Sequence, residues 1–378
     1  MNFDHDEQEK ILAEKISKMI GEAELPALES AESLEAPEIE KALRAWMKQL
    51  ASTGYLAAAV GKDQAGEMLG LLIAQKELAK ISQWLVLAAE TGARLLGGLI
   101  ADHGSDSLCN KYLKPLSQGD LICSLAVSEP ASGSQPAKLS TQARLDGEEY
   151  VLNGQKSPVN LAPLADVIGV VAQTDQGPGM FLIERGAAGL EIGERVRSLG
   201  YDALCTSSLT LTDVRVPAQA VLTSEVDFLD EIRAATDRIL VAISLGIIWR
   251  CFDEAKQAAD LPRNNAKPPA GYQMVRFTLS EMLTLGQTAE LLAYRATVAR
   301  AQADRGAKSL ALTAKVFATE TACTVSEQAM QILAASGYIK PNPVEQAFRN
   351  ARLGPIVGHT SEVARMAIAD DVLKTLVR

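Results

Sequence analysis

The chain has 378 residues, enough for two or three domains and a large buried core. Its formal net charge of −10 makes nucleic acid a poor candidate partner. Three histidines and five scattered cysteines leave little material for histidine-rich metal chemistry, a Ser-His-Asp triad, a zinc site or a disulfide framework. Reduced thiols, an acidic N-terminus without an apolar signal core and the lack of a roughly 20-residue apolar run predict a cytoplasmic protein with no membrane span.

The first block, residues 1–118, is predicted to be an all-α domain. Pro37 suits a first helical position and Gly54 a helix stop, so these two residues bracket one predicted helix. Apolar residues at helical spacing predict helices over residues 3–20, 37–50, 75–102 and 105–116. The third of these is rich in Ala and Leu and is predicted to be buried on most faces.

The middle block, residues 119–224, loses the helical period and is predicted to be a compact β-domain of six or seven strands. Glycine and proline punctuate its gaps. Asp146-Gly147 and Asn153-Gly154 are turn signals. Strands are predicted over residues 143–145, 150–152, 167–172, 179–184 and 207–216.

The last block, residues 225–378, is predicted to be a helical bundle. Helices are expected over residues 230–260, 273–304, 309–335, 342–353 and 360–376. The Ala-rich third helix is typical of a central bundle helix. In the second, the residues predicted to face inward are Leu279, Met282, Leu283, Gly286, Leu291 and Leu292.

Residues 125–156 carry the most specific pattern of the chain. They begin L-A-V-S-E-P-A-S-G-S-Q, a loop whose hydroxyls and unobstructed backbone N–H groups suit a polar ring edge or a phosphate. They end Y-V-L-N-G-Q-K. Together they resemble the flavin-binding signature of the acyl-CoA dehydrogenase family, T-E-P-x-x-G-S-D followed by N-G-x-K-x-W-I-T-N.

Further motifs agree with this resemblance over nearly the whole chain. The tail I-V-G-H-T-S-E-V-A-R has the spacing of the family's I-Y-E-G-T-S-x-I-x-R. Other landmarks are D-V-R-V-P at 213–217, Q-I-L at 331–333, G-Y at 337–338 and P-V-E at 343–345. The resemblance implies an α+β fold with an N-terminal helical domain, a middle β-barrel-like domain and a C-terminal four-helix bundle.

The family desaturates acyl-CoA thioesters. A carboxylate removes the α-proton while the β-hydrogen leaves as a hydride to the flavin. The resemblance therefore implies FAD as cofactor, an acyl-CoA substrate and an electron-transfer flavoprotein as partner. It also implies a homotetramer, or a heterotetramer with a paralogous subunit.

The family's cofactor positions are partly kept. The resemblance implies FAD contacts at Val127, Ser128, Ser134, Asn160, Arg263, Gln273, Gln331 and Thr360, and substrate contacts at Ser134 and Arg238. Asn160 stands where the family has Thr and offers an amide donor instead. Arg263 lies one residue from the usual clamp position, so it either reaches the cofactor from another direction or is an exposed loop arginine.

Several cofactor positions depart from the family pattern. Pro158 replaces the tryptophan that covers the flavin, and Pro262 replaces the clamp arginine. Asn265 replaces the phenylalanine of the clamp motif. Ala334 and Ala335 replace two glycines at a place where backbone approaches ligand.

The catalytic base is the sharpest departure, because Gly358 stands at the position of the family's glutamate. Asp237, just before Arg238, matches the position on another helix where some relatives carry the carboxylate. The alternatives for Asp237 are an Asp–Arg neighbour pair or a helix N-cap. His359 is a second candidate base, although a solvent-facing histidine at a helix start is favoured. Arg238 is either a CoA phosphate contact or a solvated arginine.

Three functional hypotheses stay open on the sequence. The first is an active FAD-dependent acyl-CoA dehydrogenase with Asp237 as its base. The second is a non-catalytic subunit without FAD, working beside a paralogue. The third is another reaction on the same scaffold, such as amine or nitroalkane oxidation, hydroxylation, or binding of a thioester without redox chemistry.

Overall fold

The structure is a computed structural model that describes residues 7–22, 31–60, 65–131, 133, 139–222, 228–262 and 267–376. The chain divides into two compact units. We call Met1–Ser30, Asp63–Val86 and Thr236–Arg378 the helical unit, and Ala31–Lys62 and Leu87–Ala235 the sheet unit. The predicted domain boundaries near 118 and 224 stay a prediction.

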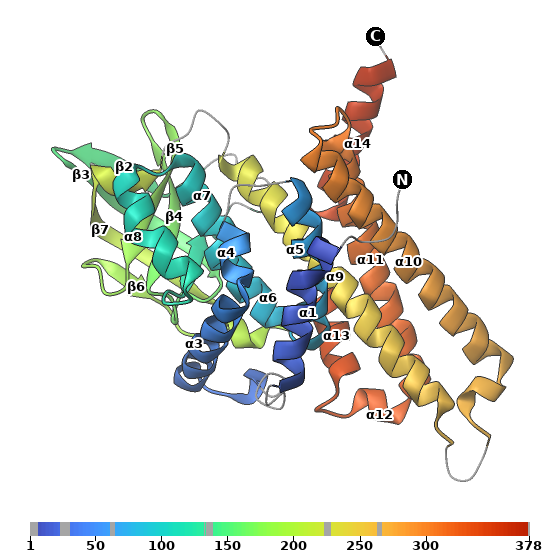
Figure 1. The fold of residues 1–378 in the computed structure, drawn as a ribbon. Coiled ribbons are helices and arrows are strands. Elements are labelled where there is room, and N and C mark those ends of the chain that lie inside the picture. Colours follow the sequence, from blue (N-terminus) through green and yellow to red (C-terminus); the bar gives the residue numbers. More distant parts are fainter. Residues whose placement is uncertain are drawn as a thin grey trace. The chain divides into compact units, whose positions relative to one another are not determined.

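The elements follow the predicted order of helices, strands and helices (Figure 1). The helices are α1 (Glu7–Glu22), α3 (Ala36–Thr53), α4 (Tyr55–Val60), α5 (Ala65–Ile81), α6 (Gln83–Glu90), α7 (Gly97–His103), α8 (Asp106–Ser117), α9 (Phe228–Asp260), α10 (Gln273–Ala301), α11 (Ala307–Leu333), α12 (Ala335–Tyr338), α13 (Pro343–Ala351) and α14 (Ser361–Leu376). The strands are β1 (Cys123–Ala126), β2 (Gln142–Asp146), β3 (Glu149–Val159), β4 (Val167–Thr174), β5 (Gly177–Glu184), β6 (Leu190–Ile192), β7 (Ser207–Pro217) and β8 (Val221–Leu222).

The single long helix predicted over 75–102 is wrong. The helix stops before Ser82, whose hydroxyl accepts a hydrogen bond from the Leu85 N–H and so starts α6. A π-helical segment, Thr91–Leu96, then separates α6 from α7. The stretch Gln83–His103 has the length and composition of a membrane-crossing helix, but 83% of its most apolar window is buried inside the protein, as in a core helix.

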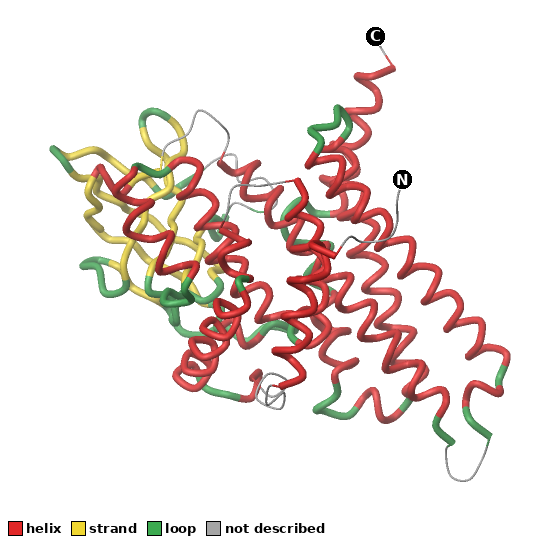
Figure 2. The backbone as a smooth tube through the Cα atoms, viewed as in Figure 1, coloured by secondary structure: helices red, strands yellow, loops and turns green. Residues whose placement is uncertain are grey.

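The strands of the sheet unit form one eight-stranded sheet (Figure 2). Its order is β6-β7-β3-β2-β4-β5-β8, with β1 pairing parallel to β4. The pairs β2–β3, β3–β7 and β4–β5 are antiparallel. Alternating apolar side chains from these strands bury a core that includes Leu152, Val159, Ile168, Val170, Phe181, Leu209 and Val214.

One of the two predicted turns in this sheet is confirmed. Gly147, with φ of 65°, lies between β2 and β3. The turn predicted at Asn153-Gly154 is wrong, because both residues lie inside β3 at a shift of register against β7. Gly154 is needed there for close approach, since a β-carbon would lie 2.6 Å from Cα of Thr141.

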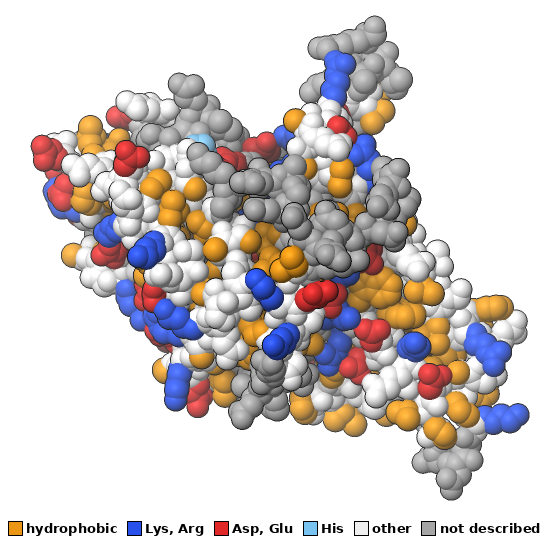
Figure 3. All heavy atoms as spheres, in the orientation of Figure 1, with side chains coloured by type: hydrophobic (Ala, Val, Ile, Leu, Met, Phe, Trp, Pro, Cys, Tyr) orange, Lys and Arg blue, Asp and Glu red, His pale blue; other side chains and the backbone are white. Residues whose placement is uncertain are grey.

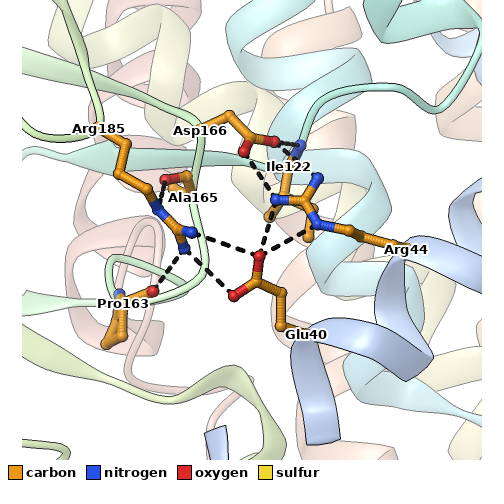
Figure 4. A network of polar contacts seen from close by, with 7 residues as sticks. All are labelled: Glu40, Arg44, Ile122, Pro163, Ala165, Asp166 and Arg185. Atoms are coloured by element: carbon orange, nitrogen blue, oxygen red, sulfur yellow. Dashed lines mark hydrogen bonds and ion pairs between the residues drawn. The ribbon is translucent and has the colours of Figure 1, made fainter. Parts of the chain in front are cut away.

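Helix α3 is fixed to the sheet within the sheet unit by a network of charged groups (Figure 4). Arg44 on α3 forms two hydrogen bonds to the Asp166 carboxylate, of 2.7 and 3.0 Å, and one of 2.8 Å to Glu40. The Ile122 N–H donates to the same Asp166 at 2.8 Å. Burial alone would raise the pKa of Asp166, but these hydrogen bonds lower it overall.

In the helical unit, α10 and α11 pack side by side. Met282 and Gly286 of α10 are buried as predicted. Leu283 and Leu291 are exposed, so their predicted inward orientation is wrong. Met274 and Phe277 of α10 are also exposed, at 72% and 58%. Figure 3 shows hydrophobic side chains interspersed with charged ones on the side of the molecule in view.

Candidate functional site

Asp237 and His359 form a buried pair in the helical unit. Asp237 lies well inside α9 and is 5% exposed, and His359 lies just before α14 and is 7% exposed. The backbone N–H of His359 donates to Oδ1 of Asp237 at 3.0 Å, and the ring Nδ1 of His359 lies 2.6 Å from Oδ2. The interior position in α9 rules out the helix N-cap considered for Asp237, and burial rules out the solvent-facing orientation favoured for His359.

Gly358 explains how the carboxylate fits. Its φ of 71° lies in the left-handed region, and a β-carbon there would collide with Oδ1 of Asp237. The Asp237 carboxylate therefore occupies the space into which a side chain at position 358 would project. Position 358 is where the family that the tail motif resembles has its glutamate.

Lys315 on α11 completes this cluster. Its side chain is completely buried, and its ammonium group donates to the backbone carbonyl of His359. Burial lowers the pKa of Lys315, while the carboxylate of Asp237 acts in the opposite direction. The sequence interpretation did not include Lys315, although a lone lysine within the apolar run L-T-A-K-V-F-A was the available signal.

The other predicted residues of the helical unit are placed as follows. Arg238 is half-buried beside Asp237 on α9. The hydroxyl of Thr360 accepts a hydrogen bond of 3.3 Å from the Val363 N–H and so caps α14. Gln273 and Gln331 are exposed on α10 and α11. Arg263 lies outside the described residues, as does Ser134 of the sheet unit.

The predicted cofactor loop lies in the sheet unit, after β1, beside the end of β3. The carbonyl of Ser128 accepts from the Ser157 N–H at 2.9 Å. The hydroxyl of Ser124 donates to the backbone carbonyl of Asn160 at 2.6 Å. The Thr206 hydroxyl donates to Oδ1 of Asn160 at 2.7 Å, which leaves the amide NH₂ of Asn160 as a donor. Ser124 and Thr206 are positioning groups that the motif did not reveal.

A buried ion pair holds this loop. Lys156 Nζ lies 2.8 Å from Glu129 Oε1 and donates to the Val127 carbonyl at 3.0 Å. The Ser140 and Thr141 N–H groups also donate to Glu129, at 2.6 and 3.0 Å. Burial would raise the pKa of Glu129, but the hydrogen bonds outweigh it and lower that pKa to about 2.

Three donors at this loop fit the acceptor-rich edge of a flavin. The Val127 N–H, the Ser128 hydroxyl and the Asn160 amide have no hydrogen-bond acceptor within the part of the chain that the structure describes. Pro158 is exposed and offers no aromatic face. Across the described ranges, no group of three or more His, Cys, Asp or Glu side chains is placed to hold a metal ion.

Comparison with known proteins agrees with the fold and the motifs. The family model described as acyl-CoA dehydrogenase, middle domain, matches residues 124–214, and the one described as C-terminal domain matches residues 233–373. The chain is 31% identical to the mitochondrial short-chain specific acyl-CoA dehydrogenase of Bos taurus, over 90% of this chain and 86% of that protein. It is 28% identical to the caffeyl-CoA reductase-Etf complex subunit CarC of Acetobacterium woodii, over 97% and 99% of the two chains.

Comparison with solved structures agrees with this fold. Butyryl-CoA dehydrogenase from Megasphaera elsdenii aligns with a TM-score of 0.88 at 24% identity, over 99% of this chain and 100% of that one. A glutaryl-CoA dehydrogenase from Mycobacterium smegmatis in complex with FADH2 aligns with a TM-score of 0.85 at 23% identity, over 97% and 95%. The predicted α+β fold class is confirmed. The chain belongs to the acyl-CoA dehydrogenase family.

Proposed function

We propose that this protein is an FAD-dependent acyl-CoA dehydrogenase in which Asp237 is the catalytic base. The observation that supports it most is the collision that a β-carbon at Gly358 would make with Oδ1 of Asp237. A carboxylate from α9 thus fills the space next to the family's glutamate position. The difference of one methylene between Asp and Glu does not keep the carboxylate away from that place.

In this proposal the residues around Asp237 prepare it for proton transfer. The backbone N–H and the ring Nδ1 of His359 contact one carboxylate oxygen each. Each carboxylate oxygen keeps a second lone pair, which is available for the α-proton of the thioester. Arg238, the next residue on α9, is proposed to contact a CoA phosphate.

FAD, when bound, accepts the hydride from the β-carbon of the substrate. We propose that Val127, Ser128 and Asn160 hold the flavin edge, since their donors lack acceptors among the described residues. Contacts from Ser134, Arg263, Gln273, Gln331 and Thr360 are proposed from the resemblance. An electron-transfer flavoprotein is the proposed electron acceptor, because the relative CarC is a subunit of an Etf complex.

Exposed hydrophobic side chains on α10 support association with other chains. Met274, Phe277, Leu283 and Leu291 expose hydrophobic side chains along one helix. We propose a homotetramer, or a heterotetramer with a paralogous subunit, located in the cytoplasm. Sedimentation of the purified protein, alone and with a co-expressed paralogue, tests the assembly.

One observation favours a second candidate function, a subunit that does not bind FAD. Ala334 has φ of 54° and ψ of −129°, a conformation suited to glycine, at a family glycine position. The resemblance implies that the β-carbons of Ala334 and Ala335 crowd a place where the family's backbone approaches a ligand. A colourless protein, both alone and with a paralogous subunit, would support this candidate.

The experiment that tests the proposal is the visible spectrum of the purified protein during anaerobic titration with acyl-CoA thioesters. Flavin absorbance that disappears with a straight-chain acyl-CoA, but not with pivaloyl-CoA, supports it, because pivaloyl-CoA has no α-hydrogen to remove. Flavin that no acyl-CoA reduces, but an amine or nitroalkane does, would replace the proposal with another reaction on the same fold.

A further inference from the structure

The side chain of His359 is buried against the proposed base, Asp237. Only one of its two contacts with Asp237 depends on the side chain. The backbone N–H donates to Oδ1 whatever residue stands at 359, whereas the 2.6 Å contact to Oδ2 requires the imidazole ring. A substitution of His359 therefore removes the contact to Oδ2 and keeps the backbone contact to Oδ1.

The geometry fixes the tautomer of the ring. An ionised carboxylate only accepts hydrogen bonds, so Nδ1 of His359 carries the proton in the contact with Oδ2. Two donors on two oxygens restrict rotation of the Asp237 carboxylate about its side-chain bonds. A base held in one orientation reacts faster than one that samples several.

The backbone of His359 is itself held by Lys315 on α11, through the hydrogen bond to its carbonyl group. Three segments thus meet here: α9 with Asp237, α11 with Lys315, and the turn before α14 with His359. The charged groups acting on the cluster are the carboxylate of Asp237, the buried ammonium of Lys315, and the carboxylates of Glu320 and Glu362, which act on Lys315.

We infer that His359 is a positioning residue for the Asp237 carboxylate. This inference rests on the proposed function of Asp237. The backbone N–H and the ring each hold one carboxylate oxygen, so loss of the ring leaves Oδ2 without this contact and lets the carboxylate rotate.

The test compares four variants of the FAD-containing protein with a substrate found by the titration above. His359→Asn keeps an amide donor near the position of Nδ1, and His359→Ala removes the donor. His103→Asn is the matched control, because His103 also contacts a carboxylate, Glu231 at 3.0 Å, in the sheet unit. Asp237→Asn serves as the reference for loss of the base. Thermal melting and near-UV circular dichroism establish that each variant is folded.

We expect His359→Ala to lower kcat about 10- to 100-fold with KM changed less than about twofold, the size of effect that misplacing a reacting group by about 1 Å produces. His359→Asn should recover most of kcat, because its amide replaces the donor at Nδ1. His103→Asn should behave as the natural protein.

Two results would overturn the inference while leaving Asp237 as the base. One is a folded His359→Ala variant with unchanged kcat. The other is a folded His359→Asn variant whose kcat is as low as that of His359→Ala, which would show that a hydrogen-bond donor at this place is not what the ring supplies. Full activity in Asp237→Asn would instead reject the proposed function.

Discussion

Asp237 and His359 are 122 positions apart in the chain, yet contacts of 3.0 and 2.6 Å join them in the interior of the helical unit. Gly358, beside them, has no side chain to compete for the space that the carboxylate fills. The glycine at the family's glutamate position is therefore compatible with a working base. The carboxylate is carried by α9, and it fits in this place because residue 358 has no side chain.

Gly358→Ala should damage this arrangement. The added β-carbon would collide with Oδ1 of Asp237, and alanine is strained at a φ of 71°. We expect a loss of about 1–3 kcal/mol in the free energy of unfolding and a larger than tenfold loss of kcat. Gly54→Ala is the matched control, because Gly54 has φ of 87° but open space around a β-carbon. Equal activity in the two variants would contradict the steric account.

Lys156→Met should destabilise the protein strongly. It leaves the buried Glu129 carboxylate without its cationic partner, and removing one member of a buried pair costs about 3–5 kcal/mol. Lys111→Met breaks an exposed pair with Glu184 and should cost less than about 1 kcal/mol. Urea unfolding of both variants measures the difference, and similar midpoints would show that the buried pair contributes no more than the exposed one.

The same carboxylate predicts an acid dependence of stability. The pKa of Glu129 is about 2 in the folded protein, below its usual value near 4.5, so the unfolded chain binds more protons between these values. The stabilisation is fully present above about pH 4.5 and is lost as the pH falls towards 2. The difference in unfolding free energy between the natural protein and Glu129→Gln should shrink over this range. A constant difference would contradict the prediction.

Ala334→Gly should stabilise the protein. Ala334 has φ of 54° and ψ of −129°, and glycine adopts this conformation without steric strain. Relief of the strain should raise the free energy of unfolding by about 1 kcal/mol. Ala335→Gly, at the start of α12, is the control and should give no gain, since glycine only adds flexibility there. Thermal melting distinguishes the two variants.

The fold was predictable where local signals agree with each other. Pro37 and Gly54 bracket α3, and Ser105 caps α8, so these helices appear close to their predicted ends. The prediction of one helix over 75–102 was wrong because composition alone does not reveal the helix cap at Ser82. The prediction of a turn at Asn153-Gly154 was wrong because the glycine is required by the close approach to Thr141 and not by a turn.

The candidate site was predictable only in part. The position of Asp237 before Arg238 matched a family pattern, so this candidate base could be named from the sequence. Its contact with His359 joins segments 122 positions apart, and the Lys315 contact joins segments 44 positions apart. Periodicity and spacing describe neighbours along the chain, so neither contact was visible before the structure.

Asp237 is proposed to accept the α-proton of the acyl-CoA substrate. The most direct measurement is the rate of anaerobic flavin reduction by an acyl-CoA substrate in the FAD-containing Asp237→Asn variant, beside the natural protein and His103→Asn. We predict a loss of about 10²–10⁴-fold in Asp237→Asn, with its fold and FAD content unchanged. Reduction by Asp237→Asn at the rate of the natural protein would contradict the account.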